Sequence, residues 1–170
     1  SKWYEYGYPS ISGHYADLIA NELNDEQSWA MAGTTYSICI KNSSSDKEKS
    51  FCMNRAIKAY ESAISISPTN VDLMINMALC YVDNPPSDNP MKGILSLREL
   101  NTKYPENVNV INQLARLAIR TNQVDKALER LQQALKLDVN NKTTICLLAE
   151  VYEMKNDLTN AEKFKKQCSK

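Results

Sequence analysis

The side chains best suited to recognise a ligand are Asn112, Arg116 and Arg120, which follow one another at intervals of four residues. On a helix this spacing places all three on one face. An asparagine amide both donates to and accepts from an extended peptide backbone, and an arginine guanidinium binds a carboxylate through two parallel hydrogen bonds. The ladder therefore predicts a surface that binds a peptide or a loop of a partner protein.

The same arginines have a structural alternative. Glu150 and Glu153 lie three residues apart later in the chain, so Arg116 and Arg120 could pair with them and join two neighbouring helices. An exposed ion pair of this kind contributes ~0–1 kcal/mol to stability. The sequence leaves both interpretations open, and the two are compatible.

Catalysis has little support in the sequence. A nucleophile activated by a general base usually needs histidine, and no motif groups the single histidine, His14, with acidic or nucleophilic residues. The glycines form no phosphate-binding loop, and no Cys-x-x-Cys or histidine cluster predicts a zinc or haem site. We therefore expect a protein that is not an enzyme and that needs no metal or cofactor.

The five cysteines also lack the spacing of a known disulfide framework. Cys80 and Cys146 each lie between large apolar residues, so we expect both to be buried free thiols that pack as small apolar groups. A disulfide between Cys39 and Cys52 is an alternative, because both would flank the same loop.

A repeating pattern must position these side chains. Residues 108–141 form one unit of 34 residues with two predicted helices. Apolar residues share one face of each helix: Leu114, Ala115 and Ala118 on the first, and Ala127, Leu131 and Ala134 on the second. Small residues at these places let paired helices approach closely.

The same register recurs through the chain from residue 26 onward. The first bulky position of successive units holds Trp29, Met74, Ile111 and Ile145. The first unit adds Gly33, Tyr36, Ala56, Tyr60, Ala63 and Pro68 at the expected places. This pattern resembles the tetratricopeptide repeat family over roughly residues 26–168. The resemblance implies an all-α fold, a right-handed α-α superhelix (TPR solenoid) of about four helix pairs with an N-terminal capping helix.

The register predicts the organisation of the chain. Residues 1–25 form an aromatic arm and the capping helix, and residues 26–170 form the repeat domain, with repeats at about 26–70, 71–107, 108–141 and 142–170. The expected helices are 14–24, 28–40, 52–66, 71–82, 91–103, 108–121, 124–137, 142–155 and 158–167. The capping helix is expected because Tyr15, Leu18, Ile19 and Leu23 share one face.

Local residues refine these boundaries. The first repeat is longer than the family pattern, and we place its extra residues in the polar run 41–47. Asn89 is predicted to cap a helix with Pro90 at its first position. Asn122 and Asn156 are predicted to adopt the left-handed conformation in the turns of the last two repeats.

In the resembled family, the first helix of each repeat lines a concave surface that binds the partner. Position by position, the resemblance implies Gln27, Ala30, Thr34, Ser37 and Ile38 in repeat one, and Asp72, Ile75, Leu79, Val82 and Asp83 in repeat two. It implies Asn109, Asn112, Arg116, Ile119 and Arg120 in repeat three, and Thr143, Cys146, Glu150, Glu153 and Met154 in repeat four. These residues are the predicted partner-binding surface.

The predicted function is non-catalytic binding of a peptide or partner protein. With 20 basic and 20 acidic residues the chain has no net charge, so nucleic acid is not an expected partner. No apolar run is long enough for membrane insertion of this segment. The alternative function is a self-associating scaffold subunit that uses its ends and the aromatic arm, in which Trp3, Tyr4, Tyr6 and Tyr8 either fold back on the stack or hold a partner.

A narrower resemblance concerns residues 89–99. The segment Asn89–Ile94 with Leu97–Glu99 looks like bacterial envelope-tethered repeat proteins related to cytochrome-maturation assembly modules. This resemblance implies a periplasmic domain tethered to the inner membrane by an upstream segment, whereas free thiols favour the reducing cytoplasm. Both compartments stay open at this point.

Overall fold

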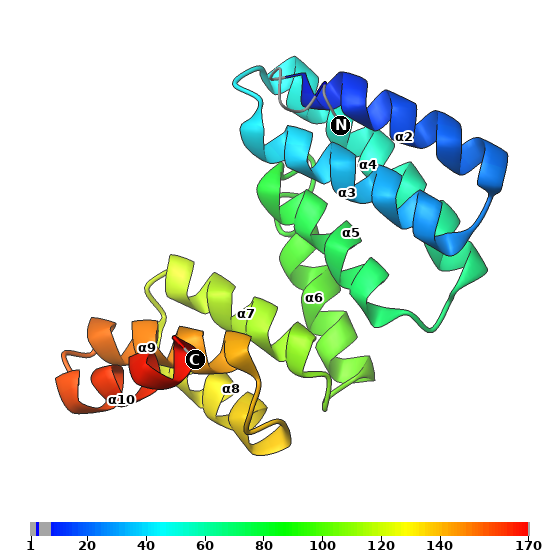
Figure 1. Ribbon diagram of the computed structural model, residues 1–170. Coiled ribbons are helices and arrows are strands. Elements are labelled where there is room, and N and C mark those ends of the chain that lie inside the picture. The colour runs from blue at the N-terminus through cyan, green and yellow to red at the C-terminus, as the bar shows by residue number, and fades with distance from the viewer. Residues whose placement is uncertain (1–2, 4–7, 170) are drawn as a thin grey trace. The chain divides into compact units, whose positions relative to one another are not determined.

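The computed structural model describes residue 3 and residues 8–169, and the regular structure of these residues is helical (Figure 1). The helices are α2 (Pro9–Leu23), α3 (Glu26–Asn42), α4 (Asp46–Ile66), α5 (Val71–Asp83), α6 (Lys92–Lys103), α7 (Val108–Arg120), α8 (Val124–Leu137), α9 (Lys142–Met154) and α10 (Leu158–Cys168). Each predicted helix is present, and most boundaries agree within two residues. None of the helices in the described ranges is long and apolar enough to cross a bilayer.

The chain divides into two compact units, Ser1–Ser96 and Leu97–Lys170, with the boundary inside α6. The first unit has a core around Tyr36, Ile40 and Tyr60, and the second around Leu131 and Leu148. The predicted domain boundary after residue 25 was based on the repeat pattern, whereas the two units are defined by compactness. That boundary stays a prediction. In the structure α2 belongs to the first unit.

One residue type marks three of the repeat boundaries. Asn70, Asn107 and Asn141 are the last residues of the first three predicted repeats, and each caps the helix that follows. Their side-chain oxygens accept hydrogen bonds from the backbone N–H groups of Asp72, Val110 and Thr144 at 3.1, 3.1 and 3.0 Å. An N-cap asparagine satisfies a donor that the helix itself leaves unpaired, so these residues fix where each repeat begins.

Left-handed asparagines end the first helices of the later repeats. Asn122 and Asn156 have φ values of 55° and 59°, as predicted, and Asn24 adopts the same conformation with φ of 47° after α2. Asparagine tolerates this backbone better than other residues with a Cβ atom.

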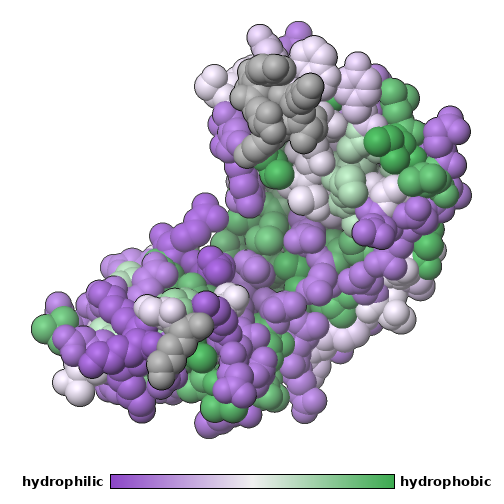
Figure 2. All heavy atoms as spheres, viewed as in Figure 1, coloured by the Kyte–Doolittle hydropathy of each residue, from purple (hydrophilic) through white to green (hydrophobic). Residues whose placement is uncertain are grey.

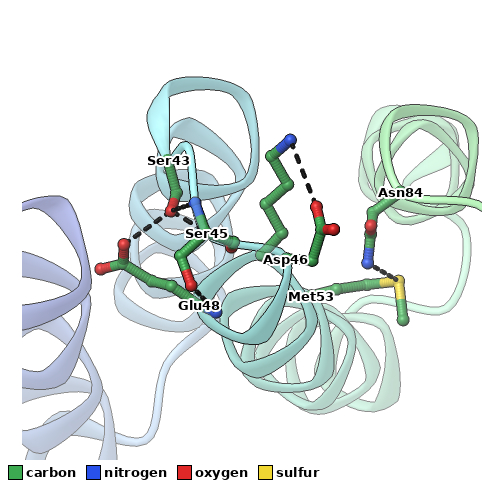
Figure 3. A network of polar contacts seen from close by, with 7 residues as sticks. Ser43, Ser45, Asp46, Glu48, Met53 and Asn84 are labelled. Atoms are coloured by element: carbon green, nitrogen blue, oxygen red, sulfur yellow. Dashed lines mark hydrogen bonds and ion pairs between the residues drawn. The ribbon is translucent and has the colours of Figure 1, made fainter.

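The long polar run of the first repeat does not form the predicted loop. Only residues 43–45 connect α3 and α4, and the extra residues lengthen both helices. Figure 3 shows the reason: Ser45 caps α4 by accepting from the Glu48 N–H group at 3.3 Å, and Ser43 donates to the Glu48 carboxylate at 2.6 Å. The acidic residues Asp46 and Glu48 also suit the positive end of the helix.

The expected helix 91–103 begins one residue later, at Lys92, and the predicted start with Asn89 as cap and Pro90 at the first position is wrong. The Asn89 carbonyl accepts a hydrogen bond from the Lys92 N–H group at 3.1 Å, and the Pro86 carbonyl accepts from Asn89 N–H at 3.1 Å. Because these bonds fold residues 86–92 into successive turns, Pro90 lies in a turn, and the helix begins at Lys92.

The cysteines differ from the prediction at one important point. Cys80 is a buried thiol as expected, but Cys146 is not free: it forms a disulfide with Cys168, with Cα atoms 5.0 Å apart. The alternative disulfide between Cys39 and Cys52 is present, with Cα atoms 6.1 Å apart. The sequence pattern missed the second bond because its two cysteines lie 22 residues apart on different helices.

Both disulfides join the two helices of one pair. Cys39–Cys52 links α3 to α4 beside the shortened loop, and Cys146–Cys168 links α9 to α10. In α10 Phe164 stacks on Tyr152 of α9, with ring centroids 5.6 Å apart. The last helix is therefore held by a covalent bond and a ring stack.

The capping helix α2 begins earlier than predicted, and the apolar stripe that predicted it is not buried. Its buried residues are Pro9, Ser12, Gly13 and Ala20, whereas Tyr15, Leu18, Ile19 and Leu23, which predicted the helix, are about half exposed. Asp17 forms an ion pair with Arg55 of α4 at 3.4 Å, which fixes the rotation of α2 about its axis. Of the aromatic arm, Tyr8 and Trp3 meet edge to face at 6.3 Å, while Tyr4 and Tyr6 lie outside the described residues.

Gly93 allows α6 to approach α5 at backbone contact distance. A methyl group at this position would lie 2.6 Å from the Val82 nitrogen and 2.7 Å from the Ala78 carbonyl oxygen. We expect Gly93→Ala to lower the free energy of unfolding by about 1–3 kcal/mol, because the clash involves backbone atoms and not a flexible side chain. Urea unfolding measures this change. The control is Leu95→Ala on the exposed face of the same helix, and equal unfolding curves for both variants would contradict the close approach.

The two disulfides predict a defined thiol count. Titration of the unfolded, unreduced protein with Ellman's reagent should detect the Cys80 thiol alone, and prior reduction should expose all five cysteines. In the folded protein the reagent should not reach Cys80, because the side chain is buried. More than one reactive thiol before reduction would show that at least one of the two bonds is absent.

Candidate functional site

A hollow of about 140 Å³ lies in the first unit, between helices α3, α4 and α5. Four lining residues come from α3, one from α4 and four from α5: Thr34, Ser37, Ile38, Lys41, Tyr60, Asn76, Leu79, Cys80 and Asp83. Ile38 and Leu79 provide an apolar wall, and the other side chains carry polar groups. The hollow therefore presents hydrogen-bonding groups beside a hydrophobic surface, as ligand sites in proteins commonly do.

Close packing of α3 against α4 brings Tyr60 to the hollow. Gly33 has no side chain, and a methyl group in its place would lie 2.7 Å from the Tyr60 ring. The ring therefore lies close to the α3 backbone, and its hydroxyl group reaches the hydroxyl groups of Thr34 and Ser37. Gly33 and Tyr60, two residues of the repeat pattern in repeat one, thus build part of the site.

A continuous network of hydroxyl and thiol groups forms the polar side of the hollow. The Tyr60 hydroxyl shares hydrogen bonds with Thr34 and Ser37 at 3.2 and 3.3 Å. Ser37 donates to the Gly33 carbonyl at 2.8 Å and lies 3.1 Å from the Cys80 sulfur. The Cys80 thiol in turn donates to the Asn76 carbonyl at 3.3 Å. Each group in the network is satisfied within the protein, so the network is rigid.

The network is uncharged at neutral pH. Burial raises the pKa of the Cys80 thiol to about 11, although the hydrogen bond with Ser37 acts in the opposite direction. Burial also raises the pKa of Tyr60. The site therefore holds no thiolate or phenolate nucleophile near pH 7.

An ion pair is part of the lining of the hollow. Lys41 near the end of α3 lies 3.5 Å from Asp83 near the end of α5. The lysine side chain is 59% exposed and the aspartate side chain 22% exposed. A partner group can thus exchange with Lys41 more easily than with Asp83, and the more buried carboxylate attracts a cationic or N–H donor.

Five residues implied by the repeat register line this hollow: Thr34, Ser37, Ile38, Leu79 and Asp83. Of the other predicted residues in repeat two, Asp72 is exposed at the start of α5, but Ile75 is not on an accessible surface. Ile75 is 3% exposed and packs in the interior, so its assignment to the binding surface is wrong. The neighbouring helices cover the N-terminal half of α5 more fully than the register implies.

The predicted ladder of the second unit is also interrupted. Asn112 is 1% exposed, and its amide donates to Asn141 at 3.2 Å and accepts from the Thr144 hydroxyl at 3.0 Å. Its hydrogen bonds are used to join repeat three to the cap of repeat four, so the predicted grip on a peptide backbone is wrong for this residue.

Most of the remaining predicted residues of the second unit lie at the surface, but Cys146 is partly buried and bonded to Cys168. Arg116, Arg120, Asn109 and Glu150 are exposed, and Ile119 is half-buried. Glu153 pairs with Lys165 of α10, and not with an arginine of α7 as the structural alternative proposed. Within the described residues no ion pair involves Arg116 or Arg120.

Four residues of the hollow were not predicted: Lys41, Tyr60, Asn76 and Cys80. Tyr60 and Cys80 were treated as core residues, which they are by burial, yet both also line the hollow. Lys41 was placed in a loop that the structure replaces with helix. The signal for Asn76 was available, because it is a polar residue one turn before Cys80 in an otherwise apolar helix.

Comparisons with known proteins support the fold. No family model matches the sequence, and no curated protein sequence matches it. Solved structures of MamA are similar: one has a TM-score of 0.56 at 14% identity, covering 98% of this chain and 90% of that chain. MamA 41-end from Desulfovibrio magneticus RS-1 has a TM-score of 0.56 at 17% identity, covering 99% and 88%. MamA AMB-1 has a TM-score of 0.54 at 19% identity, covering 99% and 92%.

These likenesses confirm the predicted fold class, an all-α TPR-like arrangement of helix pairs. They extend over nearly the whole chain, although the identities are too low to carry function across. The narrower resemblance to cytochrome-maturation modules has no support from them.

The raised pKa of Cys80 predicts a loss of stability in alkaline solution. The thiol is protonated in both states below pH 9, its ordinary range, and between pH 9 and 11 the unfolded chain loses the proton first. Stability from this group is therefore complete below pH 9 and falls as the pH rises to about 11, by at most about 2–3 kcal/mol.

Comparison with Cys80→Ser isolates this effect, because serine keeps a hydroxyl in place but does not titrate in this range. Urea unfolding measures the unfolding free energy of both proteins. The difference between them should be constant below pH 9, and above pH 9 the wild type should lose stability relative to the variant. A constant difference up to pH 11 would contradict a buried, protonated Cys80.

Proposed function

We propose that the protein is a non-catalytic interaction module whose first unit binds an extended segment of a partner protein at the hollow between α3, α4 and α5. The observation that carries this proposal is the convergence of five register-implied surface positions on a single hollow. The TPR-like fold supports protein interaction in general, and the hollow supplies a specific place for it.

The dimensions and chemistry of the hollow fit a side chain of a peptide. A space of about 140 Å³ accepts a small or medium apolar side chain against Ile38 and Leu79. The hydroxyl groups of Thr34 and Ser37 line the same space and have lone pairs that can accept from a peptide N–H group. The partner therefore needs an apolar residue next to an accessible backbone or cationic donor.

The second unit offers a separate surface for acidic groups. Arg116 and Arg120 lie one helical turn apart and are exposed, and in the described ranges neither is neutralised by an ion pair. Such guanidinium groups bind carboxylates of a partner bidentately. Glu150, also exposed, belongs to the same predicted surface.

The disulfides bear on the choice between the two compartments. Disulfides persist in oxidising compartments, and this chain contains Cys39–Cys52 and Cys146–Cys168. We therefore favour an extracytoplasmic location over the cytoplasm.

Selection from a phage-displayed peptide library tests the hollow. We expect the wild-type protein to enrich sequences with an apolar residue. Leu79→Arg should weaken binding of the selected peptides at least about tenfold, because it places a charged side chain in the apolar wall of the hollow. Fluorescence anisotropy with the labelled peptides measures this change. Leu158→Arg is the matched control, since Leu158 is 70% exposed in the second unit.

The same peptides separate the two surfaces. The double variant with Arg116→Ala and Arg120→Ala should leave binding at the hollow unchanged. It should weaken the binding of those peptides whose affinity depends on acidic residues. Selection of no peptide, or equal affinity for Leu79→Arg and the wild type, would refute binding at the hollow.

A further inference from the structure

Helix α2 has an inverted distribution of side-chain sizes. Small residues pack against the neighbouring helices: Ser12, Gly13, Ala16 and Ala20. The adjoining side of the helix carries large apolar residues that stay about half exposed: Tyr15 at 50%, Leu18 at 49%, Ile19 at 52% and Leu23 at 62%. Gly13 permits this arrangement because the Tyr36 ring lies directly against it.

The four exposed side chains form a continuous stripe. Their spacing of three, one and four residues keeps them on one face of the helix. Figure 2 shows hydrophobic surface on the part of the first unit to which α2 belongs. Single exposed apolar residues are normal, but a contiguous stripe that includes tyrosine is characteristic of an interaction surface.

The charges of α2 indicate what kind of surface can cover this stripe. The helix has no lysine or arginine, so it lacks the cationic flank with which amphipathic helices bind anionic membranes. Asp17 is already paired with Arg55. The charged or chargeable groups left beside the stripe are His14 and Glu22, both exposed.

His14 and Glu22 are placed symmetrically. Each lies four residues from Leu18, one on either side, so the face has a basic group at one end and an acidic group at the other. When two copies of such a helix pack antiparallel about a two-fold axis at Leu18, each His14 lies opposite Glu22 of the second copy. A closed two-fold interface needs this self-complementarity, because the same patch must fit itself.

We propose that the exposed face of α2, formed by Tyr15, Leu18, Ile19 and Leu23, is a homodimer interface in which α2 packs antiparallel against α2 of a second copy. Leu18 then meets its own equivalent at the axis, and the His14 and Glu22 contacts occur twice. The interface is separate from the hollow, so peptide binding and dimer formation are independent.

Sedimentation equilibrium of the whole chain tests the dimer. Over a range of about 1 to 500 μM the wild type should change from one chain to two, with no higher species, since the patch closes on itself. Leu18→Glu should raise the dissociation constant at least about tenfold, because it places two carboxylates at the axis. Leu158→Glu, the same substitution at a residue 70% exposed in the second unit, should leave the constant unchanged.

A charge exchange tests the antiparallel geometry. His14→Glu should weaken the dimer by bringing carboxylates together at both ends, and adding Glu22→Lys to the same chain should restore it towards the wild-type constant. A merely structural effect of either substitution would not be reversed by the other. Circular dichroism melting of each variant establishes that the fold is unchanged, which the exposure of all the substituted residues favours.

Three results would overturn the proposal. These are a wild type that stays monomeric over the whole concentration range, a dimer that Leu18→Glu does not weaken, and a double variant whose dimer is no more stable than that of His14→Glu alone. The first would leave the stripe to a different protein, and the second would place the dimer contact elsewhere. Leu79→Arg should leave the dimer unchanged, so failure at the hollow and failure at α2 are distinguished.

Discussion

The structure depends on the close approach of paired helices at residues that have little or no side chain. Gly33 admits the ring of Tyr60, Gly13 admits the ring of Tyr36, and Gly93 lies against the backbone of α5. In each case a single methyl group would collide with the facing helix, so the spacing of the helices is set by the absence of a Cβ atom. The position of the Tyr60 hydroxyl, and hence the polar side of the hollow, follows directly from this spacing.

The fold was predictable because local and long-range signals agree. The recurring register identified the helix pairs, and independent residues at the repeat joins, such as Asn70, Asn122 and Asn141, have the chemistry that caps or turns a helix there. The errors lie where two favourable structures compete. The polar run 41–47 suits a loop or a helix, and Ser45 with the Cys39–Cys52 disulfide decides for helix.

The site was predictable only in part, since a register states which helix face a residue occupies but not how deeply that face is covered. Leu79 and Ile75 are one turn apart on α5, yet Leu79 lines the hollow and Ile75 is buried. Asn112 fits the ladder by spacing, but the cap of the next repeat uses its amide. Tyr60 and Cys80 show the reverse case: buried side chains contribute their polar atoms to a surface site.

Helix α2 shows why apolar periodicity identifies a helix without identifying its orientation. The stripe that predicted this helix would ordinarily be expected to face the core. The core instead received the small face, because Tyr36 occupies the space that larger side chains of α2 would need, and Asp17 fixes the rotation by pairing with Arg55. Leu18 and Ile19 stay about half exposed, so this orientation forgoes roughly half of the ~1.5–3 kcal/mol that full burial of each side chain contributes. A second helix packed on this face would recover much of that free energy, which supplies a driving force for association through α2.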